Sequence, residues 1–440
     1  MTNEAEDAGT LGYWALVAIG IGGMVGGGIF AVLGLAVQLA HGGTPLAFFI
    51  AGIVALLTTA AYARLSVAFP SQGGTVEFLN QAYGVGLFSG SLNILLWLSY
   101  IVMLSLYAYA FGSYGAEFFP DGGHQVWKHV LISAVIVLMT VLNIMGSQAV
   151  GRAETWIVGI KIAILTLFIV AGASGIDHAR LAVDTWSPPV QLAAGGMLIF
   201  LAYEGFELIA NAAGDARRPR KTLPKAYYSA VLFVILLYVL IAAVAVGNLP
   251  LDKIANARDY ALAEAARPFL GHAGFILIGI AALLSTASAI NATLYGAARF
   301  SYVIAKEGEL PEALEHKIWR RPIEGLLLSS ATTLFIANLF DLSSISMMGS
   351  AGFLLIFAAV NGAALRLHAK IGGSRIVAML GLGACLAALG ALLWQVALTQ
   401  PKHLWTLAVL VGFGVFVEAA YRDATGKLRL PFNLGRNRPD

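Results

Sequence analysis

The sequence predicts an all-α integral membrane protein with 12 transmembrane helices, of which the first and the sixth are broken. Three observations support this fold class. Hydrophobic residues make up 59% of the 440 residues and charged residues only 12%, which is about half the charged share of an average soluble chain. The chain contains 12 apolar segments long enough to cross about 30 Å of hydrocarbon. Two of these segments carry glycines or carboxylates that oppose an unbroken helix.

The 12 apolar segments follow one another with short connections. The segment at 324–340 is the shortest, because Asp341 follows it directly. Two segments are longer than one crossing requires, which indicates tilt or a break. The segments cover residues 12–40, 45–69, 85–113, 126–145, 154–175, 190–213, 224–248, 272–303, 324–340, 345–368, 375–397 and 404–421, and the long ones are the first and the eighth.

The basic residues predict that both termini are cytoplasmic. An even number of spans places the termini on one side of the membrane. With that side inside, the inner connections carry 20 of the 27 Lys and Arg residues, the outer connections carry six, and Lys161 falls within a span. This excess agrees with the positive-inside rule. Residues 1–10 are acidic and polar, unlike a signal peptide, so we expect the first apolar segment to stay as a span of a cell (inner or plasma) membrane protein.

The first apolar segment contains the stretch GIGGMVGGGIF at residues 20–30. Six glycines fall within these 11 residues, and each costs about 1 kcal/mol relative to alanine in a helix interior. Close packing of membrane helices is an alternative for Gly22 and Gly26, which are four residues apart. Three consecutive glycines exceed what packing needs. Because broken backbone in a bilayer must be buried in protein or line a wet cavity, the stretch predicts the unwound centre of a transport site.

The sixth apolar segment contains FLAYEGFE at residues 200–207. Two carboxylates near the bilayer middle, Glu204 and Glu207, cost about 2.5–3.5 kcal/mol each if unpaired, so they must face protein or water. Gly205 between them offers a place to unwind. A half-helix that ends there exposes carbonyls to a cation, and the start of the next exposes amides to an anion.

The two breaks occupy corresponding positions if the first ten spans form two inverted repeats of five helices. This arrangement is typical of secondary transporters with a site at the repeat interface. We therefore divide the chain into a cytoplasmic N-terminal segment, a first repeat, a second repeat, helices 11 and 12, and a cytoplasmic tail, at residues 1–11, 12–175, 190–368, 375–421 and 422–440. We also expect a short interfacial helix within residues 70–84, capped by Thr75, and an amphipathic helix within 251–271.

Several function classes are excluded. The single cysteine, Cys385, rules out an intramolecular disulfide and a cysteine-based metal site. The eight histidines form no pair at metal-ligand spacing. We find no phosphate-binding glycine loop between a strand and a helix, and no nucleophile–base pair, so we expect neither an ATP-driven pump nor an enzyme. We expect no metal, cofactor or nucleic-acid partner; the partners are the lipid bilayer, a small-molecule substrate and protons. The sequence leaves the oligomeric state open.

Three motifs in order resemble the amino acid–polyamine–organocation (APC) superfamily. They are GGMVGGGIF at 22–30, YEGFELIAN at 203–211 with RPRKTLP at 218–224, and ASAINA at 287–292 with AKEGELP at 305–311. The resemblance covers spans one to ten, roughly residues 10–370. It implies a LeuT-like fold of two inverted five-helix repeats with two trailing helices. It also implies transport of amino acids or related amines by alternating access.

The resemblance also implies which residues bind substrate. The backbone amides around Gly26, Gly27 and Gly28 are expected to hold the substrate carboxylate, which agrees with the affinity of a helix start for anions. Met24 is expected to line the same pocket. In the sixth span the substrate contacts are expected from Leu201, Tyr203, Glu204 and Gly205, where backbone carbonyls receive the α-amine.

Lys161 is the expected coupling residue. Some proton-coupled members of the superfamily resemble this chain in having a lysine on the fifth helix, whose ammonium takes the place of sodium in related carriers. Ser285 and Ser288 are then its expected hydroxyl neighbours. A lysine in apolar surroundings gives up its proton more readily than one in water. The alternative is that Lys161 snorkels to the inner surface.

The two glutamates leave alternatives open. Glu207 aligns with an acidic residue that some relatives use in pH-dependent steps, or it is a structural hydrogen-bond acceptor. Glu204 departs from the usual uncharged residue. It receives a second substrate amine, pairs with Lys161, or is protonated at rest. We interpret Tyr100 and Tyr107 of the third span as core aromatics.

The sequence therefore predicts a secondary active transporter that imports amino acids by proton symport. An exchanger, or a carrier of polyamines or other organic amines, is the alternative within the same fold. From a different class, the alternatives are a channel or a membrane sensor. A carrier saturates and shows counterflow, whereas a channel does neither.

Overall fold

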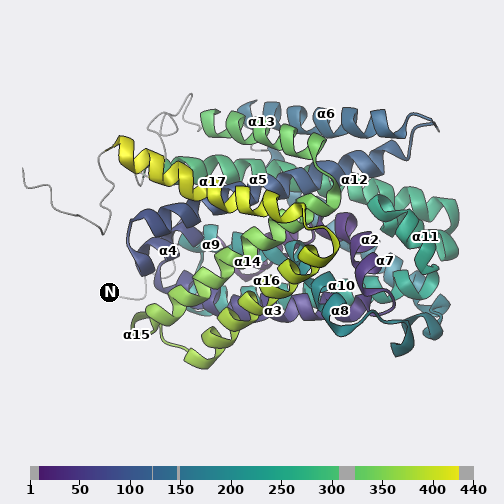
Figure 1. Ribbon diagram of the computed structural model, residues 1–440, viewed down its shortest axis with the longest axis horizontal. Coiled ribbons are helices and arrows are strands. Elements are labelled where there is room, and N and C mark those ends of the chain that lie inside the picture. The colour runs from purple at the N-terminus through teal and green to yellow at the C-terminus, as the bar shows by residue number, and fades with distance from the viewer. Residues whose placement is uncertain (1–8, 121, 146–148, 307–322, 426–440) are drawn as a thin grey trace, which may run out of the picture.

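The described part of the chain is helical throughout. The computed structural model describes residues 9–120, 122–145, 149–306 and 323–425, and the only β pairing in these ranges is two isolated bridges. Nine described helices are long and apolar enough to cross a membrane, and two bent helix pairs raise the number of candidate spans to as many as 11. A shorter apolar helix, α13, has 17 residues. The all-α membrane fold with two broken spans is confirmed (Figure 1).

The first half of the chain begins with a bent pair, whose halves meet at 46°. A short helix, α4, lies between the second and third spans. The bounds are α1 Tyr13–Met24, α2 Gly28–Ala40, α3 Thr44–Ala68, α4 Thr75–Tyr83, α5 Leu87–Ala116, α6 His124–Met145 and α7 Ala149–Gly172, followed by the 3₁₀ turns η1 Ala173–Gly175, η2 His178–Leu181 and η3 Val183–Thr185.

The second half also begins with a bent pair, here at 44°. Its bounds are α8 Pro189–Leu198, the 3₁₀ helix η4 Phe200–Glu207, α9 Leu208–Asn211, η5 Ala213–Asp215, α10 Pro219–Asn248, α11 Leu251–Asn256, η6 Arg258–Tyr260, α12 Ala261–Lys306, α13 Ile323–Leu339 and α14 Leu342–Arg366. The chain then continues through α15 His368–Ile371, α16 Arg375–Thr399 and α17 His403–Ala424.

Two helices predicted outside the spans are present. Residues 251–271 form α11, η6 and the first turns of α12, and Gly271 breaks α12 with a φ of 63° where the eighth span was expected to begin. The interfacial helix α4 starts at Thr75, but Thr75 does not cap it. Gly74 is the N-cap, and the Thr75 hydroxyl instead bonds to a buried carboxylate of the sixth span.

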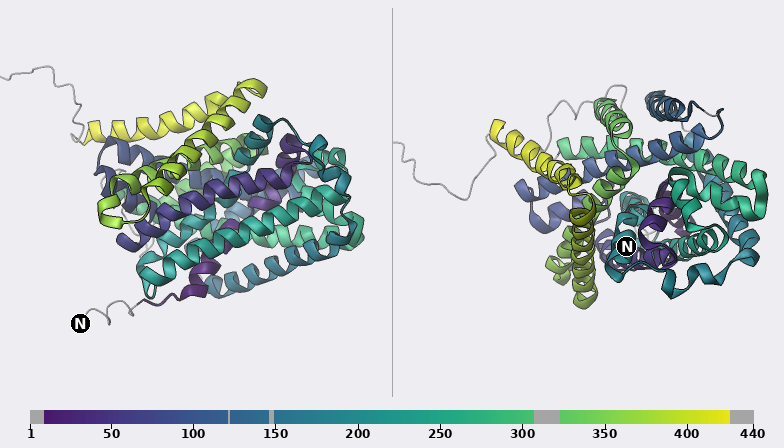
Figure 2. Two further views of the ribbon diagram at one scale, coloured as in Figure 1. Left: turned by 90° about the horizontal axis from the view of Figure 1, so that it is seen from below. Right: turned by 45° about the vertical axis from the view of Figure 1, so that its right-hand side comes forward.

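The core surrounds α5, which is buried along almost its whole length and packs against α12, α14, α6 and α17. By contrast, α6, α16 and α17 keep exposed apolar faces, as lipid-facing helices do. Figure 2 shows α16 and α17, coloured yellow-green and yellow, at one edge of the molecule. Parts of the predicted segments 1–11 and 422–440 and of the motif 305–311 lie outside the described residues.

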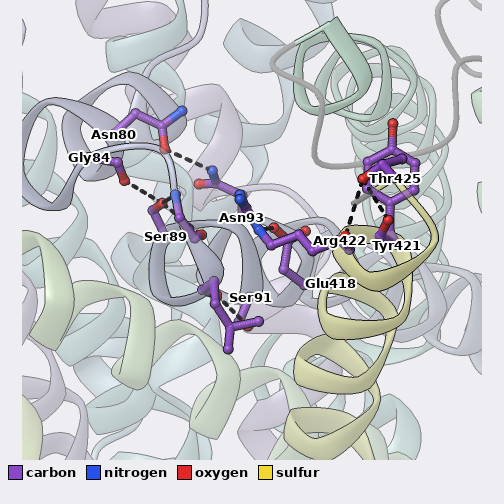
Figure 3. Close-up of polar contacts among 11 residues, drawn as sticks. Asn80, Gly84, Ser89, Ser91, Asn93, Glu418, Tyr421, Arg422 and Thr425 are labelled. Atoms are coloured by element: carbon purple, nitrogen blue, oxygen red, sulfur yellow. Dashed lines mark hydrogen bonds and ion pairs between the residues drawn. The ribbon is translucent and has the colours of Figure 1, made fainter. Parts of the chain in front are cut away.

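Polar side chains lie where α17 packs against α5, next to α4. Glu418 and Arg422 form a buried ion pair on α17, and Gly90 of α5 lies so close to the Glu418 carboxylate that a side chain there would overlap it. Asn93 of α5 donates to Asn80 of α4 at 3.2 Å. Figure 3 shows Asn93 between Asn80 and the Glu418–Arg422 pair. The same helix α4 carries Thr75, which belongs to the site described next.

Candidate functional site

The helix of the first broken span is interrupted at the glycine run. Residues 25–27 separate α1 from α2. A helix end inside the protein leaves carbonyl groups without their usual amide partners. Lys161 of α7 donates from Nζ to the carbonyl of Gly22 at 3.1 Å. Ser285 of α12 donates to the carbonyl of Val25 at 3.0 Å and also to that of Gly26. Because the C-terminal end of a helix carries partial negative charge, it is a favourable place for a lysine ammonium.

The sixth span bends after α8 and continues as the 3₁₀ helix η4. Two serines of α14 supply donors at this bend. Ser346 and Ser350 donate to the Leu198 carbonyl at 2.6 and 2.9 Å, and Ser350 accepts from the Leu201 amide at 3.1 Å. The bend is therefore held by side chains of a neighbouring helix, as broken backbone in a membrane requires.

The departure from α-helix includes Gly205 but begins at Ile199, earlier than the sequence predicted. Gly205 has a different role, because the two broken spans cross there. A Cβ on Gly23 would lie 2.7 Å from the Gly205 carbonyl oxygen, and a Cβ on Gly205 would overlap the Gly23 backbone. Two facing glycines allow the backbones to touch, as small residues do at membrane helix interfaces.

Tyr238 of α10 ties the two breaks together. Its hydroxyl lies 2.6 Å from the Met24 carbonyl and 3.3 Å from the Ala202 carbonyl. Its ring packs against Tyr203, with centroids 5.1 Å apart, and against Phe48 at 5.8 Å. One side chain thus donates to a backbone carbonyl on each broken span.

A cavity of about 670 Å³ leads to the crossing. Its lining includes exposed residues near the N-terminus, such as Trp14 at 77% exposure, and the buried Tyr107 and Glu204. The charged residues among its described lining are Glu204 and Asp215, and both are acidic. Uncharged polar groups also line it, namely Gln72, Asn211, Ser288, Thr293, Tyr107 and Tyr295. A size of this order suits a small organic molecule.

The glycine run packs tightly against Tyr107, which lines the cavity. A Cβ on Gly27 would overlap the Tyr107 ring and lie 2.9 Å from a methyl carbon of Thr286. A Cβ on Gly28 would lie 2.8 Å from the Cα atom of Ala202. The glycine run is therefore needed for close approach of α2 to α5, α12 and η4 as well as for the break itself.

A polar cluster lies near the C-terminal end of α5. It consists of Tyr109, Lys128 and Asp259, and we call it the far-end latch. Lys128 of α6 donates to the Tyr109 hydroxyl at 3.0 Å and lies 3.8 Å from Asp259 of η6. Tyr109 donates to Asp259 at 3.2 Å. Gly34 of α2 contacts the backbone of Arg258 so closely that any side chain would overlap it. The latch therefore joins α5 and α6 to a segment packed on α2.

Two buried carboxyl groups meet at the crossing. Glu207 accepts hydrogen bonds from three hydroxyls on three helices: Tyr100 at 2.5 Å, Tyr62 at 3.0 Å and Thr75 at 3.2 Å. Glu204 is close enough to Glu207 to hydrogen-bond with it. Its other oxygen, Oε2, is buried and has no hydrogen-bond partner among the described residues.

Comparison with known proteins supplies the identity of the fold. The family model described as amino acid permease matches residues 11–416. This chain belongs to the amino acid permease family. It is 36% identical to the uncharacterized protein MJ0609 of Methanocaldococcus jannaschii over 94% of this chain and 96% of that one. It is 37% identical to the inner membrane transport protein YbaT of Escherichia coli, over 84% and 86% of the two chains. The branched-chain amino acid permease BcaP of Bacillus subtilis is 24% identical over 82% and 81%.

The residues predicted to bind substrate gather around the crossing of the permease, and Glu204 is the one among them that lines the cavity. The others are packed nearby. Tyr203 donates to the Phe48 carbonyl at 3.0 Å, and Leu201 contacts Gly349. The remaining five, Met24, Gly26, Gly27, Gly28 and Gly205, form the broken backbone and its contacts.

The residues predicted to couple protons take two positions. Lys161 and Ser285 bind the broken end of α1, and Ser288 lines the cavity. Lys161 is 2% exposed and directed into the protein, which argues against snorkelling to the surface. Glu207 lies on the other broken span, where it accepts hydrogen bonds from three hydroxyl groups.

Several residues of the site were missed from the sequence. Tyr100 and Tyr107 are core aromatics as expected, but the hydroxyl of Tyr100 binds Glu207 and Tyr107 lines the cavity. Tyr62 and Tyr238 were not singled out at all. A usable signal existed, because a buried tyrosine hydroxyl needs a hydrogen-bond partner. That signal identifies candidates without naming their partners.

Proposed function

We propose that this permease imports amino acids by proton symport with alternating access. The observation that carries the proposal is the crossing of two broken spans beside a cavity. The buried Lys161 of α7 bonds to the first of these spans. This arrangement combines a helix start suited to a carboxylate with carbonyls at the helix breaks suited to an amine. Amino acid permease is also the description of the family, and BcaP is by name a permease for branched-chain amino acids.

In this proposal the substrate spans the two breaks. Amides of residues 26–28 hold the carboxylate, and carbonyls of residues 201–205 receive the α-amine, with Met24 beside them. The tight packing of Gly27 against Tyr107 means that Tyr107 must move for the amides to meet the substrate. Division into repeats at 12–175 and 190–368 gives both breaks the same position within a repeat.

Proton coupling is assigned to Lys161, with Ser285, Ser288 and Glu207 as its partners in the cycle. When Lys161 loses its proton, the hold on the Gly22 carbonyl weakens, and the broken end of α1 is free to move. The excess of basic residues in the predicted inner connections supports an inner- or plasma-membrane topology with both termini on the cytoplasmic side. The cavity then faces the cytoplasm, and this conformation is the inward-open one.

Uptake by purified protein in sodium-free proteoliposomes tests the coupling. We expect an inward proton gradient to drive accumulation of an amino acid by the wild type and not by Lys161→Ala. The exposed Lys402→Ala serves as the matched control and should behave as wild type. Full proton-driven accumulation by Lys161→Ala contradicts the assignment. Saturation and counterflow in the same vesicles separate a carrier from a channel.

A further inference from the structure

The carboxyl pair at the crossing is asymmetric in its surroundings. Glu207 accepts from three hydroxyls, of Tyr62, Thr75 and Tyr100, and is 1% exposed. Three donated hydrogen bonds stabilise the charged form of a carboxyl group. Glu207 therefore has hydrogen-bond donors that offset part of the cost of burying a carboxylate.

Glu204 has the opposite environment. It is 3% exposed, Oε2 has no partner among the described residues, and the neighbouring group is the Glu207 carboxyl. A second negative charge here would be buried, adjacent to a first one and without a donor of its own. Each of these three conditions disfavours ionisation.

Among the described residues, the side chains with printed contacts around the pair are hydroxyl and aromatic groups. Around it, α3, α4 and α5 contribute the hydroxyls already named, α10 contributes Tyr227 and Tyr238, and α14 contributes the rings of Phe353 and Phe357. The part of α1 at the crossing is glycine backbone. Lys161 is directed to the Gly22 carbonyl, and Asp215 is exposed.

We propose that the Glu204–Glu207 pair is a proton-binding site in which Glu204 carries the proton and its O–H donates a hydrogen bond to the Glu207 carboxylate. Glu204 lines the cavity, so it is the member that exchanges its proton with cavity water, while Glu207 remains an acceptor held by α3, α4 and α5. The proposal rests on the proposed proton symport and adds a second proton site to Lys161. It also decides among the alternatives for Glu204. A neutral acid at rest attracts no second substrate amine, so the site takes zwitterionic amino acids with uncharged side chains.

Infrared difference spectroscopy of the whole protein in lipid tests the proton directly. A protonated carboxylic acid has a carbonyl stretching band that a carboxylate lacks. We expect this band in the wild type at neutral pH, its loss in Glu204→Gln, and its retention in Glu207→Gln and in the control Asp215→Asn. Transfer to D₂O should shift the band, because the cavity gives water access to Glu204. Glutamine closely matches the shape of a protonated glutamate, so Glu204→Gln is expected to fold.

The outcomes separate this proposal from the proposed function. A band that persists in Glu204→Gln, or one that is absent from the wild type, overturns the proton assignment. Lys161→Ala should keep the band whatever its effect on uptake. If the wild type shows the band but no proton-driven uptake, symport fails while the protonated pair stands. As a second readout, preference for lysine over alanine as substrate would contradict a neutral Glu204.

Discussion

Replacing Tyr238 by phenylalanine tests whether one hydroxyl holds the two breaks together. The substitution keeps the ring against Tyr203 and removes the hydrogen bonds to the Met24 and Ala202 carbonyls. Interhelical hydrogen bonds in membrane proteins contribute about 0.6 kcal/mol on average, and a buried carbonyl left unpaired costs about 1–3 kcal/mol. The 2.6 Å bond is the stronger of the two, so we expect a total loss of about 1–3 kcal/mol.

The assays for Tyr238→Phe are thermal unfolding in detergent and initial uptake rate in proteoliposomes. We expect a lower unfolding temperature, and also a lower uptake rate because the two breaks lose their shared hydrogen-bond donor. Tyr83→Phe is the matched control. It also removes a tyrosine hydroxyl that bonds to a backbone carbonyl, but that carbonyl belongs to Ala359 of α14 and not to a broken span. If the two variants lose uptake equally, or if Tyr238→Phe matches the wild type, the Tyr238 hydroxyl does not hold the two breaks together.

Three further substitutions probe other parts of the structure. Gly27→Leu should abolish uptake, because its side chain would overlap neighbouring helices, while membrane insertion measured by yield in the membrane fraction should remain. Arg422→Gln removes the guanidinium partner of the fully buried Glu418, which should cost about 3–5 kcal/mol and lower the thermal unfolding temperature. Asp259→Asn breaks the ion pair of the far-end latch, so hydrogen exchange of the η6 backbone should become faster, measured by mass spectrometry.

Each of these predictions has a contrary result. Uptake by Gly27→Leu at the wild-type rate would show that the neighbouring helices can accommodate a side chain at this position. An unchanged unfolding temperature for Arg422→Gln would mean that α17 is held by apolar packing alone. Unchanged exchange in η6 after Asp259→Asn would show that the latch does not hold that segment.

The membrane fold and the presence of a break in two spans were predictable because they depend on local composition. Long apolar stretches mark spans, and a glycine run marks a break wherever it occurs. The second break was placed less well. Gly205 suggested unwinding, yet the bend comes at Ile199, where serines of α14 satisfy the freed backbone. Gly205 is instead needed for contact with Gly23. The sequence of one span cannot tell which of these two uses a glycine serves.

The site was only partly predictable because its partners come from distant helices. Lys161 stood out as a charge within an apolar span, but its bond to Gly22 joins residues 139 positions apart. Tyr238 carried no signal beyond being a tyrosine in an apolar span. Thr75 was expected to cap a helix, and it contacts Glu207 instead. Such pairings depend on how α3, α4, α7 and α10 pack around the breaks, which no single segment encodes.

Amino acid accumulation in sodium-free proteoliposomes tests the central claim most directly. Wild-type protein is reconstituted, an inward proton gradient is imposed, and the internal concentration of a labelled zwitterionic amino acid is followed. We predict accumulation above the external concentration that collapses when a protonophore removes the gradient. Equilibration without accumulation, or accumulation that survives the protonophore, would contradict proton-coupled import by this permease.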